Sequence, residues 1–335
     1  MKIGLTYNLG TDYEFRDDDP ADAAAEFDTE ATIEGLQSAI NAYGHEPVLI
    51  GDGKKLLAWL SNNRADLIFN IAEGYAGRAR EAQIPALLEL QQIPYVGSDP
   101  VTLGVALDKV MTKQIMKAER IPTAPFLKII KPEDLNGSGV PLRFPLFAKP
   151  VHEGTGKGID ANSRINNYPK LKTKVKYLIK TYKEPVLIEE YLEGEEFTVG
   201  IVGTPPKVLG TMQIVFDTTK SEDFYSYHVK EDYESLVHYI CPPRIDPDRL
   251  QQIEDIALHA YRVLDCKDFG RVDIRCDAEG NPYFLEINPL AGLNPQHSDL
   301  SIIARHNGIP YEELIGRILQ SAFTRYKLVK SRADD

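Results

Sequence analysis

The sequence FGRVDIRCDAEGNPYFLEINPLAGLNPQHSDL, residues 269–300, decides the fold expected for the whole chain. Apolar residues recur at Phe269, Val272 and Ile274, a turn follows at residues 277–281, and a second apolar run returns over residues 283–287. This pattern predicts a β-hairpin with a glycine-containing turn.

Three polar side chains of this hairpin are candidate metal ligands. Asp273 lies on the first strand, and Glu286 and Asn288 lie two positions apart on the second, so that they face one side of the sheet. Such oxygen ligands suit Mg²⁺, which keeps several waters and takes further contacts from substrate phosphates. The alternative is a sheet with ordinary solvent-facing acids. The shared face, the flanking apolar runs and the following Pro-Leu-Ala-Gly loop favour the metal site.

The composition is typical of a globular protein with two or three domains. The chain has 335 residues, of which 43% are hydrophobic and 26% are charged. Its net charge of −12 argues against non-specific binding to nucleic acid or to an acidic membrane surface. Cys241, Cys266 and Cys276 are scattered and odd in number, as expected for reduced thiols. No signal-peptide or transmembrane pattern is recognised, so a cytoplasmic location is expected.

The first third of the chain predicts a parallel α/β domain. Strands at 3–7, 47–50 and 67–70 alternate with helices at about 29–43 and 54–62. Residues 70–74 leave the carboxyl end of the third strand, where open α/β sheets bind ligands. Arg78, Arg80 and Glu81 follow at the start of a helix over 82–91, either as a solvated helix start or as ligand-binding residues.

The middle of the chain predicts a phosphate site. After the loop at residues 97–100, a helix capped by Asp108 carries Lys109 and Lys113 one turn apart, and one of these lysines is expected on the surface. A linker at 121–125 precedes a strand at 145–148 that ends in Lys149. Alternate glycines at 154, 156 and 158 then form a loop whose amides can close over phosphates. The glycines alone are weak evidence for a phosphate site. Lys149 strengthens it, because an ammonium group at the end of the preceding strand can meet the same phosphates.

The next segments predict a nucleotide pocket. Residues 186–192 form a buried strand that ends in acids, and the carboxylates around it either hold an adenine edge and ribose hydroxyls or lie on an exposed turn. Strands at 198–202 and 208–215 lead to a polar, aromatic segment from Phe216 to Ser235, which is long enough for a lid. The remaining predicted helices lie at 169–183, 247–264, 298–306 and 311–323.

Taken together, these segments resemble a known family. IPYVGS, LDKVMTK, FPLFAKP with EGTGKG, VLIEEYLEGEEFTV, FGRVDI and FLEIN occur in the order of the ATP-grasp ligases, and within them the chain is most similar to the D-alanine–D-alanine ligases. The resemblance implies an α/β ATP-grasp fold, in which an N-terminal parallel α/β domain precedes two α+β subdomains that enclose the nucleotide. The expected domains are residues 1–96, 97–192 and 193–328.

The resemblance also implies roles for matching residues. Lys109 and Lys149 match the family's nucleotide-phosphate lysines, and Asp273, Glu286 and Asn288 match its metal ligands. The phosphate loop is matched by Glu153, Gly154, Thr155, Gly156 and Gly158, and the adenine and ribose positions by Glu189, Glu190, Leu192 and Glu196.

Five further residues match positions near the reacting groups. Arg271 and the backbone of Gly292 match the groups that hold the oxyanion. Lys230 lies in the predicted lid, Ser298 matches the serine that receives the second substrate's carboxylate, and Glu26 lies near the expected carboxylate for a substrate ammonium.

The implied chemistry is ATP-dependent peptide-bond formation between two amino acids through an acyl phosphate. The implied cofactors are ATP and Mg²⁺, with two ions expected and Mn²⁺ as a possible substitute. The expected partners are small-molecule amino-acid substrates, with neither nucleic acid nor membrane involved, and a homodimer is implied by the family.

Departures from the family cluster at the amino-acid pockets. The family's His-Gly and Gly-Glu-Asp-Gly patterns are replaced by residues 70–74 and 77–81, and its glycine-rich turn is replaced by residues 10–28. A tyrosine of the family's lid is replaced by Glu231. The family's Thr-Ser-Pro-Gly-Met-Thr loop is replaced by residues 289–294. D-Alanyl-D-alanine synthesis for the cell wall is the leading function, followed by ligation of another amino-acid pair. Arg78 and Arg80 suggest an acidic first substrate. A non-ligating nucleotide-binding protein is the alternative from a different class.

Overall fold

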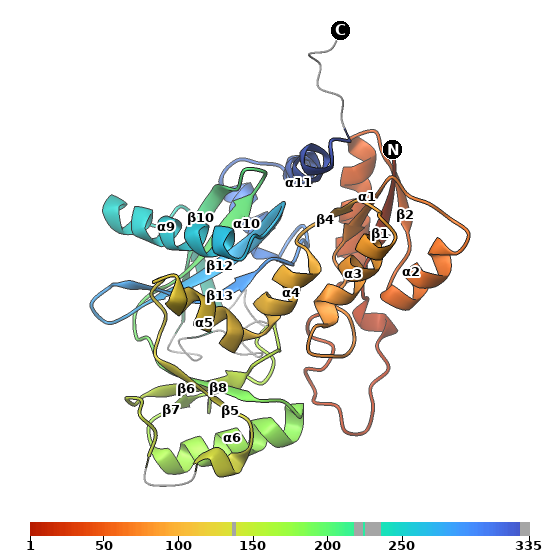
Figure 1. Ribbon diagram of the computed structural model, residues 1–335. Helices are drawn as coiled ribbons and strands as arrows, with labels where there is room; N and C mark the ends of the chain where they lie inside the picture. Colours follow the sequence, from red (N-terminus) through yellow and green to blue (C-terminus); the bar gives the residue numbers. More distant parts are fainter. Residues whose placement is uncertain (136–138, 218–223, 225–235, 329–335) are drawn as a thin grey trace.

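Three β-sheets organise the described part of the protein (Figure 1). The structure is a computed structural model that describes residues 1–135, 139–217, 224 and 236–328. Each sheet lies within one of the three segments predicted from the sequence, and the two later sheets face each other across a cleft lined by the predicted nucleotide residues.

The N-terminal sheet is parallel, as the alternating strands and helices predict. Its order is β2-β1-β3-β4, with β1 at Lys2–Thr6, β2 at Glu46–Leu49, β3 at Leu67–Asn70 and β4 at Tyr95–Val96. Helix α1 (Glu30–Ala42) and the distant α11 (Tyr311–Tyr326) pack together over one set of core residues, which includes Leu5 and Phe69. Helices α2 (Gly53–Leu60) and α3 (Gln83–Leu90) cover a second core around Ile68. Short 3-10 helices occur at Gly10–Asp12 and Arg80–Ala82.

The central sheet is antiparallel and carries one covering helix. Its order is β5-β8-β6-β7, with β5 at Phe126–Ile129, β6 at Leu146–Pro150, β7 at Arg164–Ile165 and β8 at Val186–Glu190. A 3-10 helix at Pro132–Leu135 and helix α6 (Tyr168–Tyr182) pack on the sheet and bury Leu171, Val175 and Leu178 against it. The open face of this sheet is left for the nucleotide cleft.

The C-terminal sheet contains the predicted hairpin of residues 269–288. Its order is β11-β10-β9-β12-β13. The bounds are Glu196–Val202 for β9, Lys207–Phe216 for β10, Val237–Ile240 for β11, Phe269–Cys276 for β12 and Pro282–Asn288 for β13. Helix α9 (Pro247–Val263) buries Ile253, Ala257 and Tyr261 against the sheet, and α10 (Asp299–His306) contacts β10 and β9.

The predicted helices and strands match the observed ones to within a few residues. The helix predicted to be capped by Asp108 is confirmed as α5 (Lys109–Ala118), where the Asp108 side chain accepts hydrogen bonds from the amides of Val110 and Met111. Helix α4 (Pro100–Leu107), which Asp99 caps through the amide of Thr102, was not predicted as a helix of its own.

The division at residues 96 and 192 remains a proposal. Helices α4 and α5 fall in the segment assigned to the central domain, but both contact β13 of the C-terminal sheet. Helix α11 falls in the C-terminal segment, but it packs on α1.

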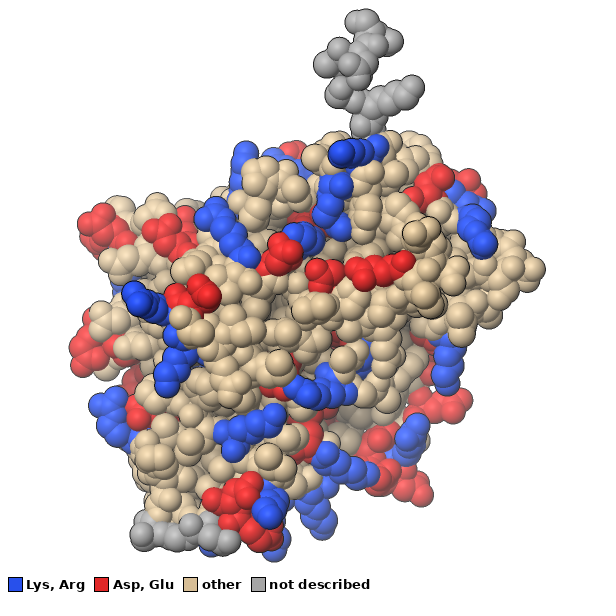
Figure 2. Space-filling model, viewed as in Figure 1, with Lys and Arg blue, Asp and Glu red and all other residues tan. Residues whose placement is uncertain are grey.

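Charged side chains of both signs are interspersed over the face shown in Figure 2. This face therefore carries no large patch of one sign. Among the described helices, none combines the length and the apolar character that crossing a bilayer requires.

Candidate active site

The hairpin of β12 and β13 brings the predicted metal ligands together. Asp273 pairs with Glu286 across the two strands, and Arg271 pairs with Asn288. The Oδ1 atom of Asp273 accepts a hydrogen bond from Thr198 at 2.8 Å, and its Oδ2 atom accepts one from Asn288 at 3.2 Å. Burial raises the pKa of Asp273 to about 7, Arg271 opposes this rise, and Glu286 adds to it. Adjacent carboxylates whose joint ionisation is disfavoured fit a divalent cation, because its charge stabilises the ionised forms.

A buried charge cluster lies beside the hairpin. The Nζ atom of Lys149 on β6 lies 3.2 Å from Oε1 of Glu189 on β8, and that of Lys113 on α5 lies 2.8 Å from Oε2. Burial lowers the pKa of Lys149, but Glu189 and Glu286 outweigh burial and raise it overall. Lys149 therefore keeps its positive charge inside the cleft, where it also lies 3.7 Å from Oε2 of Glu286.

The prediction that Lys109 or Lys113 is a surface lysine is wrong. Lys113 is 1% exposed and the Lys109 side chain is 11% exposed. The Nζ atom of Lys109 donates to the backbone oxygen of Glu153 at 2.6 Å and lies 3.8 Å from Oε2 of Glu286. Lys109 thus joins the phosphate loop to the hairpin, and Lys113 balances the charge of Glu189.

An aromatic and acidic pocket lies between the central and C-terminal sheets. The rings of Phe147 and Tyr191 stack with centroids 5.9 Å apart, and Phe224 meets Phe147 edge-on at 5.0 Å. Arg275 donates to the backbone oxygen of Leu192 at 2.7 Å, to Glu196 at 2.7 Å and to the Tyr191 hydroxyl at 2.6 Å. The predicted adenine and ribose residues Glu189, Glu190, Leu192 and Glu196 all line this pocket, as does Gly156.

The phosphate loop is anchored by an acid from the segment that follows β1. Glu26 accepts hydrogen bonds from the amide of Gly154 at 2.5 Å and from Arg80 at 2.8 Å to each oxygen, and Lys157 lies 3.5 Å away. The Glu26 side chain is only 5% exposed. Its two oxygens are occupied by the protein itself, so this arrangement does not support the predicted role of Glu26 as the carboxylate for a substrate ammonium.

A second acid fixes the other end of the loop. Asp22 accepts a hydrogen bond from the amide of Gly158 at 2.9 Å and one from the Tyr182 hydroxyl at 2.8 Å. Gly158 has φ +74°, and a Cβ atom there would lie 2.6 Å from Cγ of Pro150, so only glycine fits. The loop is therefore held at both ends by residues of the N-terminal domain.

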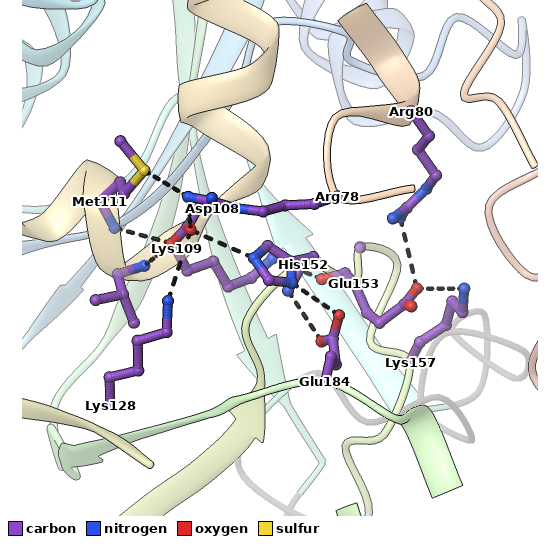
Figure 3. A network of polar contacts seen from close by, with 12 residues as sticks. Arg78, Arg80, Asp108, Lys109, Met111, Lys128, His152, Glu153, Lys157 and Glu184 are labelled. Atoms are coloured by element: carbon purple, nitrogen blue, oxygen red, sulfur yellow. Dashed lines mark hydrogen bonds and ion pairs between the residues drawn. The ribbon is translucent and has the colours of Figure 1, made fainter. Parts of the chain in front are cut away.

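A further network links the start of α5 to the same loop (Figure 3). Asp108 is fully buried and accepts a hydrogen bond from Arg78 at 2.8 Å. The Nε2 atom of His152 lies 3.3 Å from Oδ2 of Asp108, and its Nδ1 atom lies 2.9 Å from Oε2 of Glu184. Burial lowers the pKa of His152, but the two carboxylates raise it overall. Because His152 directly precedes Glu153, this network sets the start of the phosphate loop relative to α5.

The two arginines do not support an acidic first substrate. Arg78 is paired with Asp108, and Arg80 is paired with Glu26 and lies 3.5 Å from Glu153. Both cations are matched by carboxylates of the protein, so neither is available as the main partner of a substrate carboxylate.

A cavity beside the hairpin carries more carboxylates than its surroundings neutralise. It is bounded by Arg271, Glu286 and Asn288, by the loop residues Gly154 and Thr155, and by residues 289–293, which include Gly292. Asp28, Glu73 and Glu81 also line it. Burial raises the pKa of Glu81 and of Asp28 to about 7, and burial together with Glu81 raises the pKa of Glu73.

Glu81→Gln is expected to stabilise the ligand-free protein at pH 8. A carboxyl group whose pKa is about 7 when folded and 4.5 otherwise binds its proton more tightly in the folded state. Stability is therefore lost as pH rises from about 4.5 to 7, and the full penalty is present above pH 7. Glutamine removes this penalty. The free energy of unfolding should therefore rise by about 1–3 kcal/mol at pH 8 and by much less at pH 5.

Urea unfolding of the wild type and of Glu81→Gln at both pH values measures the effect. The substitution Glu34→Gln on the exposed face of α1 serves as the control and should change stability little. An equal or larger gain from Glu81→Gln at pH 5 would show that Glu81 is not destabilised by ionisation.

Arg271 stands where the two pockets meet. It lines both the nucleotide pocket and the acidic cavity, as Glu286 does. Its Nη1 atom lies 2.5 Å from Oδ2 of Asp299 and 3.3 Å from Oδ1 of Asp273. Two carboxylates thus orient the guanidinium group toward the junction of the pockets.

Gly292 and Ser298 lie close together beside that junction. A Cβ atom on Gly292 would lie 2.8 Å from the Ser298 hydroxyl, and this hydroxyl accepts a hydrogen bond from the amide of Asn294 at 2.8 Å. Gly292 lines the acidic cavity. Ser298 precedes α10, and its hydroxyl binds the backbone of the loop at residues 289–294 through Asn294. Its role toward a second substrate stays a prediction.

Some residues of the site are not predicted by the sequence pattern, and others lie outside the described residues. Arg275, Thr198 and Tyr191 were missed, although Arg275 alternates along β12 with Arg271 and Asp273 and so shares their face. Lys230 and most of the segment from Phe216 to Ser235 lie outside the described residues, so the predicted lid is not tested.

Comparisons with known proteins give a consistent result. A family model described as the D-ala D-ala ligase C-terminus matches residues 115–320. The chain is 32% identical over 292 residues to a D-alanine–D-alanine ligase of Pseudomonas entomophila, a match that covers 86% of this chain and 85% of the relative. It is 31% identical over 302 residues to an uncharacterized protein of Sinorhizobium fredii, covering 88% of each.

The fold has similar solved structures. A crystal structure of the D-alanine–D-alanine ligase from Bacillus anthracis, complexed with ATP, matches with a TM-score of 0.75 and 23% identity. The match covers 98% of this chain and 99% of that chain. At this identity, the likeness shows the shared fold.

Proposed function

The chain belongs to the D-alanine–D-alanine ligase family and has the ATP-grasp fold, and we propose that it joins the carboxylate of one amino acid to the amine of another. Membership of the family makes the protein an ATP-dependent ligase, as the sequence predicted. The proposal rests chiefly on one observation, which is that Arg271 and Glu286 line both the nucleotide pocket and the acidic cavity. A phosphoryl group bound in the first pocket is therefore next to a carboxylate bound in the second.

The nucleotide is assigned to the aromatic pocket. Phe147, Tyr191 and Phe224 offer ring faces and edges to a base, and Glu196 offers a buried carboxylate to ribose hydroxyls. Lys109 and Lys149 supply positive charge for the phosphates, and the loop amides of Thr155 and Gly156 supply donors. The amides of Gly154 and Gly158 donate to Glu26 and Asp22 and anchor the loop.

Asp273, Glu286 and Asn288 are proposed to hold Mg²⁺, with a second ion and replacement by Mn²⁺ as further expectations. Mg²⁺ supplies charge neutralisation to the phosphates when bound. Thr198 fixes one oxygen of Asp273, so it sets the direction of the other.

The reaction follows from these positions. A carboxylate oxygen of the first amino acid attacks the γ-phosphorus of ATP, a new O–P bond forms and the bond to ADP breaks. The amine of the second amino acid then attacks the acyl carbon, loses a proton and displaces inorganic phosphate. Arg271 and the amide of Gly292 are proposed to donate to the oxyanion that develops on the acyl oxygen. Lys149, whose charge is retained by Glu189 and Glu286, is proposed to stabilise the transferred phosphoryl group.

Release of ADP and product mass test this function directly. The protein is incubated with Mg·ATP and with D- and L-amino acids, singly and in pairs. A dipeptide formed together with ADP is the expected result, and D-alanine is the reference substrate because relatives carry that name. Binding of ATP without ADP release or dipeptide for any pair would favour the non-ligating alternative. A cytoplasmic location, a homodimer and a role in cell-wall synthesis are proposed from the family alone.

Thr198→Val is expected to weaken Mg²⁺ activation. The change keeps the shape of the side chain but removes its hydrogen bond to Asp273. Loss of such a supporting contact typically costs roughly 10–100-fold in metal affinity. Initial rates measured against Mg²⁺ concentration should therefore show half-saturation at higher Mg²⁺.

Thr211→Val is the matched control for this experiment. Thr211 is also buried on the same sheet, but its hydroxyl donates to Glu254, away from the hairpin. If both variants shift the Mg²⁺ dependence equally, or if neither does, the hydrogen bond to Asp273 does not tune a metal site.

A further inference from the structure

The charges that line the acidic cavity are unbalanced. Five carboxylates and two cations face it, and these are Glu26, Asp28, Glu73, Glu81 and Glu286 against Lys109 and Arg271. Because buried charges are costly unless they are paired, the partner of each group decides what a ligand must supply.

Two of the five carboxylates have partners within the protein. Glu26 is held by Arg80, which approaches it from outside the cavity, and by the amide of Gly154. Glu286 lies within 4 Å of both Lys109 and Lys149, and it belongs to the proposed metal site.

The other three carboxylates have no such partner. Among the described residues, Asp28, Glu73 and Glu81 form no ion pair with a lysine or arginine. Glu81 is only 9% exposed and faces the cavity, where Glu73 is its hydrogen-bonding neighbour. Burial is the largest cause of the raised pKa of all three acids. Arg80 opposes it at Glu73 and Glu81, and Lys109 opposes it at Glu81, but neither cation lies within ion-pair distance and the pKa stays raised.

These acids converge from three separate segments. Asp28 precedes α1, Glu73 follows β3, and Glu81 lies in the 3-10 helix before α3. They meet on the side of the cavity formed by the N-terminal domain, while Arg271, Glu286 and Asn288 form the side where phosphoryl transfer is proposed. A substrate whose carboxylate faces the hairpin must therefore direct its remaining groups toward the three acids.

We propose that this cavity selects a diamino acid as the first substrate, with Asp28, Glu73 and Glu81 binding its α-ammonium and a second ammonium on its side chain. An amino acid with a neutral side chain, such as alanine, brings only the positive charge of its α-ammonium group to the three carboxylates. The remaining buried negative charge then stays uncompensated. A diamino acid brings two, and an acidic substrate would add a further negative charge. The inference rests on the proposed function, because it takes the cavity as the site of the amino acid that is activated.

The test compares substrates and variants in the full-length protein. The value of kcat/KM for ADP release is measured with the D- and L-forms of alanine, 2,4-diaminobutyrate, ornithine and lysine, at fixed Mg·ATP, and products are identified by mass. The best diamino acid is expected to exceed alanine. In Glu73→Gln and Glu81→Gln, the ratio of kcat/KM for that diamino acid to kcat/KM for alanine should fall roughly 30-fold or more, as when one partner of a buried charge pair is removed.

Controls separate binding from folding. Glu34→Gln removes an exposed carboxylate and should keep the wild-type ratio. Because Glu81→Gln is expected to be more stable than the wild type, a lower ratio in this variant cannot be attributed to unfolding. Alanine preferred over every diamino acid, or an unchanged ratio in both cavity variants, would overturn the inference while leaving the ligase function intact.

A second readout keeps the two proposals distinguishable. If no amino acid, alanine included, drives ADP release, the proposed function fails. Calorimetric titration of the same diamino acids, in the presence of a non-hydrolysable ATP analogue and Mg²⁺, then measures their binding to the cavity without any turnover. Binding that is lost in Glu73→Gln and Glu81→Gln supports its selectivity, and no binding to the wild type contradicts it.

Discussion

Arg271→Lys is expected to lower the rate of dipeptide formation by about 10²–10³-fold, because it removes a preorganised donor to the oxyanion. The lysine keeps the positive charge between Asp273 and Asp299 but cannot reproduce the planar, multiply donating guanidinium group. The metal site and the nucleotide pocket therefore keep their charge balance. ADP release should fall less than dipeptide formation, because the oxyanion develops only when the amine attacks.

Measuring ADP and dipeptide in the same reaction separates the two steps. The expected result is a variant that consumes more ATP per dipeptide than the wild type does. Arg262→Lys, on the exposed face of α9, is the control and should behave as the wild type. A parallel loss of both products would place Arg271 in phosphoryl transfer instead, and unchanged dipeptide formation would remove it from the site.

Arg80→Met is expected to cost about 3–5 kcal/mol of the free energy of unfolding, because it leaves the buried Glu26 without its main cation. Arg80 donates to both oxygens of Glu26 at 2.8 Å, and both side chains are less than 10% exposed. The phosphate loop depends on the same pair through Gly154, so the KM for ATP should rise as well.

Arg78→Met is the matched control, two residues away. Arg78 also binds a carboxylate, but its side chain is 59% exposed, so its loss is expected to cost no more than about 1 kcal/mol. The double variant Arg80→Met with Glu26→Gln should recover part of the stability, since it no longer buries an unpaired charge. Similar losses for the two single variants in urea unfolding would contradict the importance assigned to the buried pair.

The elements that local patterns encode were predictable. The hairpin of residues 269–288 follows from alternation and turn residues, and its ladder brings Asp273 opposite Glu286. Lys149 and the phosphate loop follow from a strand that ends at a glycine-rich segment. In each case the residues that matter are near one another in the sequence, so strand geometry alone places them.

The pairing of charges between distant segments was not predictable. Glu26 is matched by Arg80 and by Lys157, and the sequence offers no sign that these groups meet. The same holds for Lys113, whose burial depends on Glu189 of another element. An arginine read alone suggests an acidic ligand, but only the packing of the domains shows that the protein already neutralises it.

The three acids of the cavity illustrate the same limit. Glu81 has the sequence appearance of a solvated helix start, but α4 packs on the 3-10 helix that contains it and buries its side chain. Asp28 and Glu73 approach it from other segments. A ligand site of this kind depends on tertiary packing that neither periodicity nor spacing reports.

The most direct test of the central claim uses an amino acid labelled with oxygen-18 in its carboxylate. If the protein activates that carboxylate as an acyl phosphate, one labelled oxygen should leave with the inorganic phosphate for each dipeptide formed. One ADP should be released in the same turnover. Unlabelled phosphate, or AMP and pyrophosphate in place of ADP and phosphate, would contradict the mechanism.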